Sequence, residues 1–455
     1  MFTESGFTLI VGAGPTGLTL ARVLQRHGVP FRIVEQSPTP PDGSRGKGIQ
    51  PRTQEVLDDL GLLPAFRSVG RDYPALLIHL PDGGEMTQRM DELHDPTPAV
   101  PYPNMLMHPQ WRTSALLAEG IPVEYGVSVV SLTDDDVTLS TGETVTPRYI
   151  VGCDGGRSTI RKALDIPFEG DSFPTEQLIV ADVQVPGLSR DHWHIWPGAD
   201  QRSMRLALCP MPGTDTFQLT APPSDLSLSS LVASVGLSLA AVGWQSLYRA
   251  NIRMVSRYRA GKYFLAGDAA HVHSPAGGQG LNTGIQDAYN LGWKLAYEGL
   301  LDTYEEERLP VAAGVLGIST KLHRRAVSAT DDALRRDDPV LRQLSLNYRG
   351  SSLSAEHRPH PGRVQAGDRA PGPLLDLLHG PHFTLLAFHW TGPLPALPPD
   401  CHVHHVTDPS AASTYDAQKP TLFLVRPDNY IACATHNADD VTNYLDAIRT
   451  PSTQL

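Results

Sequence analysis

A glycine-rich stretch near the N-terminus has the residue types and spacing needed to hold a pyrophosphate. Gly12-Ala13-Gly14-Pro15-Thr16-Gly17 follows a short apolar run and opens a segment with helical spacing. Glycines allow a tight turn and close approach of the phosphates, and a helix start supplies free N–H groups. Glu35 ends the next apolar run, 18 residues after Gly17, where its carboxylate can accept hydrogen bonds from ribose hydroxyls. The combination predicts a dinucleotide-binding βαβ unit.

Two further acidic residues stand where apolar runs end in glycine turns. Asp154 follows the run 149–153 and precedes Gly155-Gly156, and Asp268 follows the run 263–267. A glycine loop after Asp268 leads into another helical segment at about residue 280. A carboxylate at a strand end can bind a ligand hydroxyl, and a helix start can stabilise negative charge on the N1–C2=O edge of a flavin. The Asp154-Gly155 pair is an ordinary turn signal alone and becomes specific beside the other two motifs.

Composition excludes several classes of partner. The net charge is −12, and no basic segment could follow a phosphate backbone, so we expect no nucleic-acid partner. No apolar run has the length and hydropathy of a bilayer span, and the N-terminus lacks a signal-peptide pattern, so we expect a cytoplasmic protein without membrane contact. The four cysteines are scattered, and His271 and His273 have no further metal ligands at suitable spacing. We therefore predict no metal site.

The elements that must position these residues alternate between strand and helix. The ranges 7–11, 15–27 and 31–34 have the pattern of strand, helix and strand, whereas 71–103 and 176–221 are rich in short β-like pieces. The apolar stretch Leu226–Trp244 is interpreted as a core helix. We predict a discontinuous dinucleotide-binding domain over residues 1–70, 102–175 and 256–326, and a β-rich substrate domain over 71–101 and 176–255. A linker or helical segment covers 327–361, and a C-terminal domain covers 362–455.

With three motifs in this order, the sequence resembles the flavoprotein aromatic hydroxylases. These single-component FAD monooxygenases include para-hydroxybenzoate hydroxylase and the branch of phenol hydroxylases, polyketide hydroxylases and rifampicin monooxygenase. The resemblance implies an α/β fold: a Rossmann-like FAD-binding domain, an inserted β-sheet substrate domain and a C-terminal thioredoxin-like domain. The last domain has no C-x-x-C pair, which makes it structural or interfacial.

The resemblance also assigns roles to individual residues. Arg45 lies at the family's loop arginine near the flavin, Gln110 matches the glutamine that contacts the cofactor, and Asp268 matches the acid on the ribityl chain. Arg45 and Pro275 are the candidate catalytic residues beside the reactive edge of the flavin. The full set implied to bind the cofactor is Gly12, Gly14, Pro15, Thr16, Gly17, Glu35, Gln36, Arg45, Gln110, Asp154, Asp268, Pro275, Gly278, Gly280, Leu281 and Asn282.

The implied activity is an NAD(P)H- and FAD-dependent monooxygenation by a monomer or homodimer. Non-covalent FAD, reduced by NADPH or NADH, would react with O2 to a C4a-hydroperoxide that hydroxylates an electron-rich aromatic or polyketide- or antibiotic-like small molecule. Two alternatives stay open. One is a flavin-dependent halogenase, because 193–197 (WHIWP) is weakly similar to a tryptophan motif of that group. The other is a non-catalytic FAD-binding redox sensor.

Overall fold

A parallel sheet forms the centre of the N-terminal half of the chain. The computed structural model describes residues 6–200, 203–274, 277–327 and 335–449. The sheet has the order β18-β19-β12-β1-β2-β8, and all neighbours except β18 and β19 pair in parallel. Its strands are β1 (Thr8–Val11), β2 (Phe31–Glu35), β8 (Val123–Tyr125), β12 (Tyr149–Gly152), β18 (Arg259–Ala260) and β19 (Tyr263–Leu265). The carboxyl ends of β1, β2, β12 and β19 therefore meet at one edge, where ligands bind in open parallel sheets.

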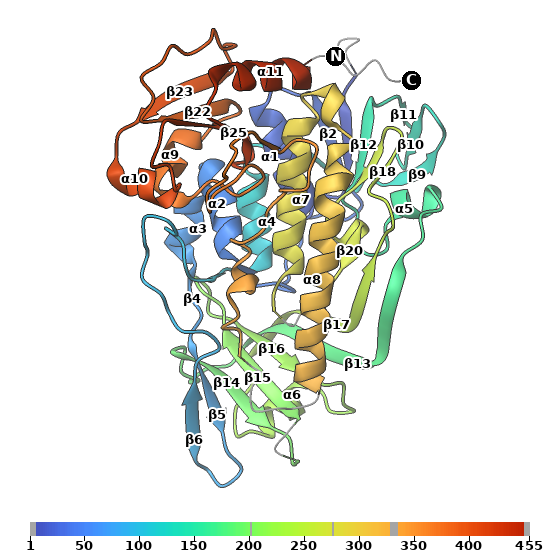
Figure 1. Cartoon of the computed structure of the whole chain (residues 1–455). Coiled ribbons are helices and arrows are strands. Elements are labelled where there is room, and N and C mark those ends of the chain that lie inside the picture. The colour runs from blue at the N-terminus through green and yellow to red at the C-terminus, as the bar shows by residue number, and fades with distance from the viewer. Residues whose placement is uncertain (1–5, 201–202, 275–276, 328–334, 450–455) are drawn as a thin grey trace.

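Helices pack on this sheet and on one another. The pair α1 and α7 approach closely because Gly292 has no side chain: a Cβ there would lie 2.5 Å from Val23 Cγ1. Figure 1 shows α7 and α8 running side by side along the molecule. The helices of this half are α1 (Pro15–Arg26), α2 (Pro51–Asp59), α3 (Leu63–Val69), α4 (Gln110–Ala118), α5 (Thr159–Ala163), α7 (Gly280–Lys294) and α8 (Thr303–Val327).

An eight-stranded sheet joins the two β-rich regions of the sequence. Its order is β20-β17-β13-β16-β15-β14-β5-β6, and β5 pairs in parallel with β14 across more than a hundred residues of sequence. Figure 1 shows β5, β6 and β14 to β16 at the end of the molecule remote from the C-terminal strands, and the long β13 and β17 run from there toward its middle. The strands are β5 (Ala75–His79), β6 (Glu85–Gln88), β13 (Glu169–Gln184), β14 (His192–Pro197), β15 (Met204–Pro210), β16 (Phe217–Ala221), β17 (Ala241–Met254) and β20 (His271–Val272).

The prediction of one core helix over Leu226–Trp244 is wrong. Only α6 (Leu228–Ala233) is helical, and β17 begins at Ala241. Ser234 caps the helix, and Gly236, two residues further on, has φ +78°, a left-handed conformation that costs glycine little. The residues that follow pair with β13 as a long antiparallel strand, and most remain partly exposed.

Short strands complete the N-terminal half. They form two three-stranded sheets, β11-β10-β9 and β3-β7-β4. Their bounds are β3 (Gly48–Ile49), β4 (Arg71–Asp72), β7 (Leu106–Met107), β9 (Val129–Leu132), β10 (Val137–Leu139) and β11 (Thr144–Val145). The β3-β7-β4 sheet lies just beyond the loop that carries Arg45, and it anchors the end of that loop.

The C-terminal part forms a five-stranded mixed sheet in the order β21-β25-β24-β22-β23. β22 and β23 are parallel, and β24 is antiparallel to both β22 and β25. Its strands are β21 (Ala355–Glu356), β22 (Phe383–Phe388), β23 (Cys401–Val406), β24 (Thr421–Val425) and β25 (Ile431–Thr435), and its helices are α9 (Leu375–Leu378), α10 (Pro409–Thr414) and α11 (Ala438–Arg449).

Buried charges fix this C-terminal part to the parallel-sheet half. Arg426, after β24, donates to Glu307 of α8 over 2.6 Å, and Lys294 of α7 donates to the same carboxylate over 2.7 Å. All three side chains are fully buried.

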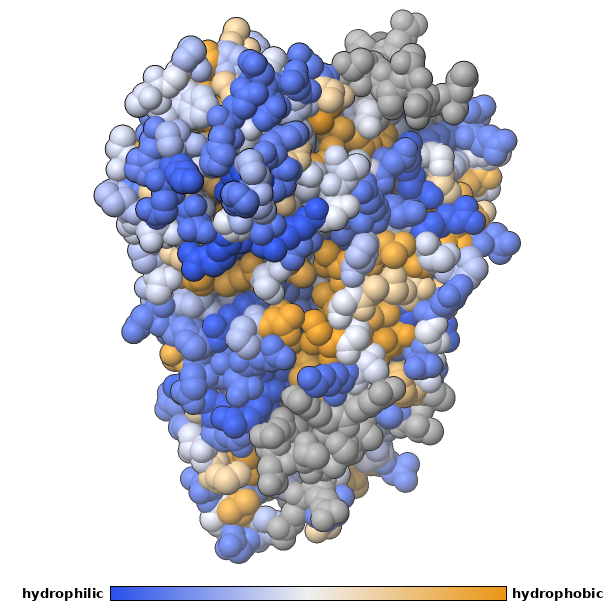
Figure 2. All heavy atoms as spheres, in the orientation of Figure 1, coloured by the Kyte–Doolittle hydropathy of each residue, from blue (hydrophilic) through white to orange (hydrophobic). Residues whose placement is uncertain are grey.

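The visible surface is polar over much of the C-terminal part, whereas apolar residues gather in the middle of the face, where α8 lies (Figure 2). No helix in the described ranges has the length and apolar character of a membrane span.

Candidate functional site

A cavity of about 2540 Å³ lies between the ligand-binding edge of the parallel sheet and the eight-stranded sheet. Pockets for single drug-sized ligands measure roughly 300–1,000 Å³. The cavity therefore has room for an extended dinucleotide and a second organic molecule. The described cofactor candidates that line it are Gly12, Gly14, Pro15, Thr16, Glu35, Gln36, Arg45, Gln110, Asp154, Asp268, Gly278, Gly280 and Leu281.

The three remaining candidates are placed differently. Gly17 and Asn282 do not line the cavity but support residues that do. Pro275 lies outside the described residues, so its predicted place beside the flavin stays a prediction.

The first glycine turn leaves no room for side chains. Gly12 has φ +105°, and a Cβ there would lie 2.4 Å from the carbonyl oxygen of Cys153. A Cβ at Gly17 would lie 2.0 Å from the carbonyl oxygen of Gly12. The turn therefore requires glycine at both positions, and α1 begins at Pro15 with no side chain capping its N–H groups. An uncapped helix start facing a cavity suits an anionic group.

Glu35 is held by the same turn. Its two carboxylate oxygens accept from the backbone N–H of Ala13 over 2.9 Å and of Ser37 over 2.8 Å. Each carboxylate oxygen has two acceptor positions, so both can still accept a hydroxyl from the cavity. The backbone contacts fix the position of the carboxylate before any ligand binds.

Asp154 and Asp268 have unequal surroundings. Asp154 Oδ2 accepts from the N–H groups of Thr159 and Ile160 over 2.6 and 3.3 Å, so this carboxylate binds the N–H groups at the start of α5. Its Oδ1 is buried and has no partner among the described residues. Asp268 is exposed, but only within the cavity, where the surrounding protein raises its pKa. Both carboxylates therefore keep acceptor capacity for a ligand.

The turn that carries Asp268 is supported from behind by a buried network. Asp287 accepts from the N–H of Gly267 over 3.0 Å, from His271 Nε2 over 2.6 Å and from Arg308 Nε over 2.8 Å. His271 Nδ1 lies 2.8 Å from His273 Nε2. These contacts, which the sequence motif did not reveal, use the two histidines as structural groups.

The start of α7 is fastened to the loop after β2. Asn282 accepts from the N–H of Gln50 over 2.8 Å and donates to the carbonyl oxygens of Gly48 and Gly278 over 2.9 and 2.8 Å. Gly278 has φ +62°, and the helix begins at Gly280 with no side-chain cap. A second uncapped helix start therefore faces the cavity.

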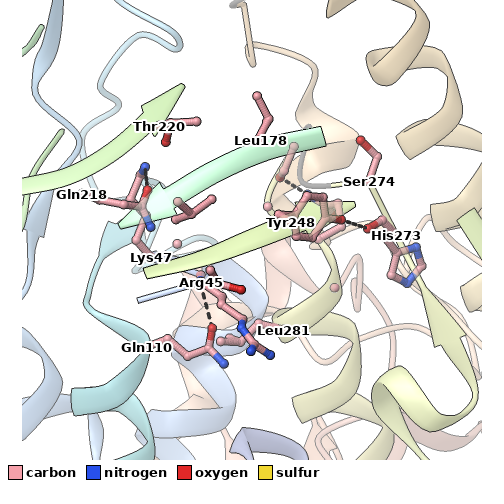
Figure 3. A pocket seen from close by; sticks show the side chains of 18 of the residues that line it. Arg45, Lys47, Gln110, Leu178, Gln218, Thr220, Tyr248, His273, Ser274 and Leu281 are labelled. Carbon is pink, nitrogen blue, oxygen red and sulfur yellow. Dashed lines mark hydrogen bonds between the residues drawn. The ribbon is translucent and has the colours of Figure 1, made fainter. Parts of the chain in front are cut away.

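The loop carrying Arg45 is held on two sides. On one side Gly46 N–H donates to Gln110 Oε1 over 2.7 Å, as Figure 3 shows. On the other, Ser44 N–H donates to Asp182 Oδ2 of the eight-stranded sheet over 3.0 Å. Arg45 itself is exposed, with its guanidinium carbon 5.8 Å from the ring centre of Trp244.

Sequence reasoning missed the polar residues that the eight-stranded sheet places around this loop. Lys47 donates to Gln218 Oε1 (Figure 3). Its nitrogen lies 4.1 Å from the ring centre of Trp193. Tyr73 also lines the cavity near them. No local motif marks these residues, because they come from a loop and from strands far apart in the sequence.

The residues present fit an FAD molecule: a Cβ would block the first glycine turn at two positions, two helix starts have no side-chain cap, and the carboxylates keep spare acceptor positions. The comparisons agree with this fit. The FAD binding domain family matches residues 7–319. A flavin-dependent monooxygenase of Mycobacteroides abscessus is 42% identical, over 96% of this chain and 98% of its own length.

Two further comparisons point the same way. A rifampicin monooxygenase of Streptomyces venezuelae is 36% identical over 68% of this chain and 69% of its own. The structure of the OxyS anhydrotetracycline hydroxylase from Streptomyces rimosus superposes with a TM-score of 0.76 at 29% identity, over 98% of this chain and 99% of that one. The chain belongs to the family of FAD-dependent monooxygenases.

Proposed function

We propose that this monooxygenase uses NADPH or NADH to hydroxylate an electron-rich aromatic or polyketide-like small molecule. One observation carries the proposal: a single cavity has a dinucleotide cradle at one end and an apolar sheet at the other. Relatives named rifampicin monooxygenase, 6-methylpretetramide 4-monooxygenase and pentachlorophenol 4-monooxygenase support this substrate class.

In the proposed complex, FAD binds without a covalent bond along the ligand edge of the parallel sheet. The N–H groups at the start of α1 bind the pyrophosphate, Glu35 accepts from the ribose and Asp268 accepts from the ribityl chain. The start of α7, beside Leu281, stabilises negative charge on the flavin ring. Gln36, Gln110 and Asp154 line the rest of the path.

The bound cofactor, once reduced, supplies one oxygen atom derived from O2. The chain's own contribution is to position the substrate and to exclude water. Leu76, Ile78, Ile195 and Ala207 form a buried apolar cluster on the eight-stranded sheet, and all four line the cavity. An apolar wall at this place presents the flat face of an aromatic substrate to the flavin and keeps water from diverting the oxygen.

The reductant is proposed to reach the flavin without a dinucleotide domain of its own. The sequence has no second G-x-G-x-x-G unit after a strand, which supports the proposal that the reductant would bind at the same cavity. The backbone of the Arg45 loop is fixed by hydrogen bonds to two different elements, and we propose that its exposed arginine side chain would steer a flavin ring bound beside it. Substrate is then expected to control the rate of flavin reduction.

We also propose that the domain division stated from the sequence holds and that the C-terminal part is a thioredoxin-like domain without redox activity. Its two cysteines, Cys401 and Cys433, are buried and unpaired. Burial raises the pKa of each thiol to about 12, so neither is a thiolate at neutral pH.

Isotope labelling tests the proposed reaction. The purified yellow protein is supplied with NADPH and a panel of phenols and aromatic polyketides, first under ¹⁸O₂ and then in H₂¹⁸O. We expect one heavy atom in the product from the gas and none from water. Label from water, a chlorinated product formed with added flavin reductase and chloride, or FAD reduction with no oxygenated product would each reject the proposal.

A further inference from the structure

One cation in the cavity lacks an anionic partner. Lys47 follows Arg45 by two residues, and its nitrogen donates to the side-chain oxygen of Gln218, a neutral acceptor. No described carboxylate forms an ion pair with it, although Asp182 is close enough to favour its charged form. The surrounding protein lowers the pKa of the Lys47 ammonium group. Lys47 is half-buried and lines the cavity, so its ammonium group has one amide oxygen as a direct partner and its remaining donors available on the cavity side.

The groups around Lys47 leave it free to bind a ligand. The amide of Gln218 is oriented because its nitrogen donates to the backbone oxygen of Ser44, so its oxygen stays on Lys47. An ammonium group has three donors, and this contact uses one. One carboxylate oxygen of Asp182 accepts from the N–H of Ser44. The other is buried without a partner among the described residues.

The remaining neighbours define what shape of ligand fits. The Trp193 ring lies on one side of the ammonium group, and Tyr73 packs near that ring, 6.3 Å between centres. The Cys209 thiol is buried behind them, and its own pKa is raised by that burial. The apolar residues Leu76 and Ile195 continue the same wall. The walls suit a flat ring system, and the single cation suits one acidic oxygen on it.

We propose that Lys47 is a specificity-determining residue that binds an acidic oxygen of the aromatic substrate, a phenolate or enolate. This inference rests on the proposed function, because it places the substrate on the eight-stranded sheet. A phenolate ring is more electron-rich than the neutral phenol, so the contact that selects the substrate also favours its oxygenation. A neutral ether of the same shape cannot neutralise the ammonium group and is selected against.

Binding of a matched probe pair to the FAD-loaded protein tests the inference without turnover. The probes are 2-hydroxyanthraquinone and 2-methoxyanthraquinone, which differ by one ionisable oxygen, and their affinities are measured by equilibrium dialysis. A charge-assisted hydrogen bond predicts a preference of about tenfold or more for the hydroxy probe. We expect Lys47→Met to abolish this preference, Lys47→Arg to keep it, and Thr220→Val, a neutral change on the same cavity wall, to leave it unaltered.

A second measurement uses the unmutated protein alone. The absorption of the bound hydroxy probe, titrated with pH, reports the pKa of its phenol, which we expect to fall on binding. An unchanged or raised phenol pKa, no preference in the wild type, or a preference retained in Lys47→Met would each overturn the assignment. A protein that shows the preference but incorporates no ¹⁸O from the gas would overturn the proposed function and leave this site in place.

Discussion

The parallel-sheet half of the molecule has two large interfaces that are built in opposite ways. At the C-terminal interface, between α7 and α8 and the C-terminal part, Glu307 binds both Arg426 and Lys294, and Arg426 also binds Asp428. At the cavity interface, between the ligand edge and the eight-stranded sheet, about 2540 Å³ is left open. At the C-terminal interface, every charge of the Glu307 cluster is paired. At the cavity interface, carboxylates with spare acceptor positions and the Lys47 ammonium group face the open cavity.

Two lysines make the comparison concrete. Burial lowers the pKa of Lys294 to about 8 against the pull of the Glu307 carboxylate, and the pKa of Lys47 is lowered by the same cause. Lys294 has a carboxylate at 2.7 Å, whereas Lys47 has an amide oxygen. Lys294 is fully buried with a carboxylate partner built in and so stabilises an interface, whereas Lys47 is half-buried beside the cavity, where we propose that a ligand supplies the anion.

The largest expected effect is the loss of stability on breaking the C-terminal interface. Arg426→Met leaves Glu307 and Asp428 buried beside fewer cations, which costs about 3–5 kcal/mol of unfolding free energy. Urea denaturation measures it. The control is Arg349→Met, because Arg349 pairs with Asp368 at the surface, where such a pair is worth about 1 kcal/mol or less.

The same denaturation experiment on Lys47→Met sharpens the contrast. Removing a cation that has no built-in carboxylate should change the unfolding free energy by less than about 1 kcal/mol. Equal losses of unfolding free energy in Arg426→Met and Lys47→Met would show that Lys47 stabilises the fold as Arg426 does. The contrast between the two interfaces would then fail.

The next largest effect is on cofactor affinity at the cavity interface. In the proposed complex, Asp268→Ala would remove a charge-assisted hydrogen bond to the ribityl chain, worth about 1.5–3 kcal/mol, so FAD affinity should fall about 10- to 100-fold. Recovery of flavin fluorescence on dilution measures the dissociation constant. Asp165→Ala, at an exposed turn outside the cavity, serves as the control. Unchanged affinity in Asp268→Ala would mean that the motif has been assigned to the wrong part of the cofactor.

A smaller effect follows from pH. The preference for the hydroxy probe over its methyl ether requires a charged Lys47, and the pKa of this lysine is lowered from 10.5. The preference should therefore disappear as pH rises through a value below 10.5. Lys47→Arg should retain it there, since a guanidinium stays charged above pH 12. A preference that persists in the wild type up to pH 11 would contradict this.

The smallest effect on affinity is expected at Arg45. The side chain is exposed and contacts Trp244, so Arg45→Ala should change FAD affinity by less than about threefold. Stopped-flow absorbance should instead show slower flavin reduction by NADPH, with more H₂O₂ released, because the loop steers the ring. A large loss of FAD with normal reduction of the remainder would make Arg45 an anchor of the dinucleotide.

The sequence predicted the parts of the site that a short stretch of backbone builds. Gly12 and Gly17 are dictated by contacts within one turn and its neighbouring strand, and Asp268 stands where its strand pattern ends. Lys47 and Gln218 escaped prediction because 171 residues separate them and because they come from a loop and from β16, which pairs with other strands. The core helix expected over Leu226–Trp244 was wrong because its apolar content does not distinguish a helix from a strand, and pairing with β13 makes the residues from Ala241 onward a strand.

The side-chain amide of Gln218 connects ligand binding at Lys47 with the position of the Arg45 loop. Its oxygen accepts from Lys47, and its nitrogen donates to Ser44, which neighbours Arg45. A ligand that binds the free donors of Lys47 shares this ammonium group with the amide and so changes the free energy of the loop, and thermodynamic reciprocity requires the loop position to change the ligand's affinity by the same factor. The ratio of probe affinities with oxidised and reduced flavin is then a direct reading of the coupling free energy between the two ends of the cavity.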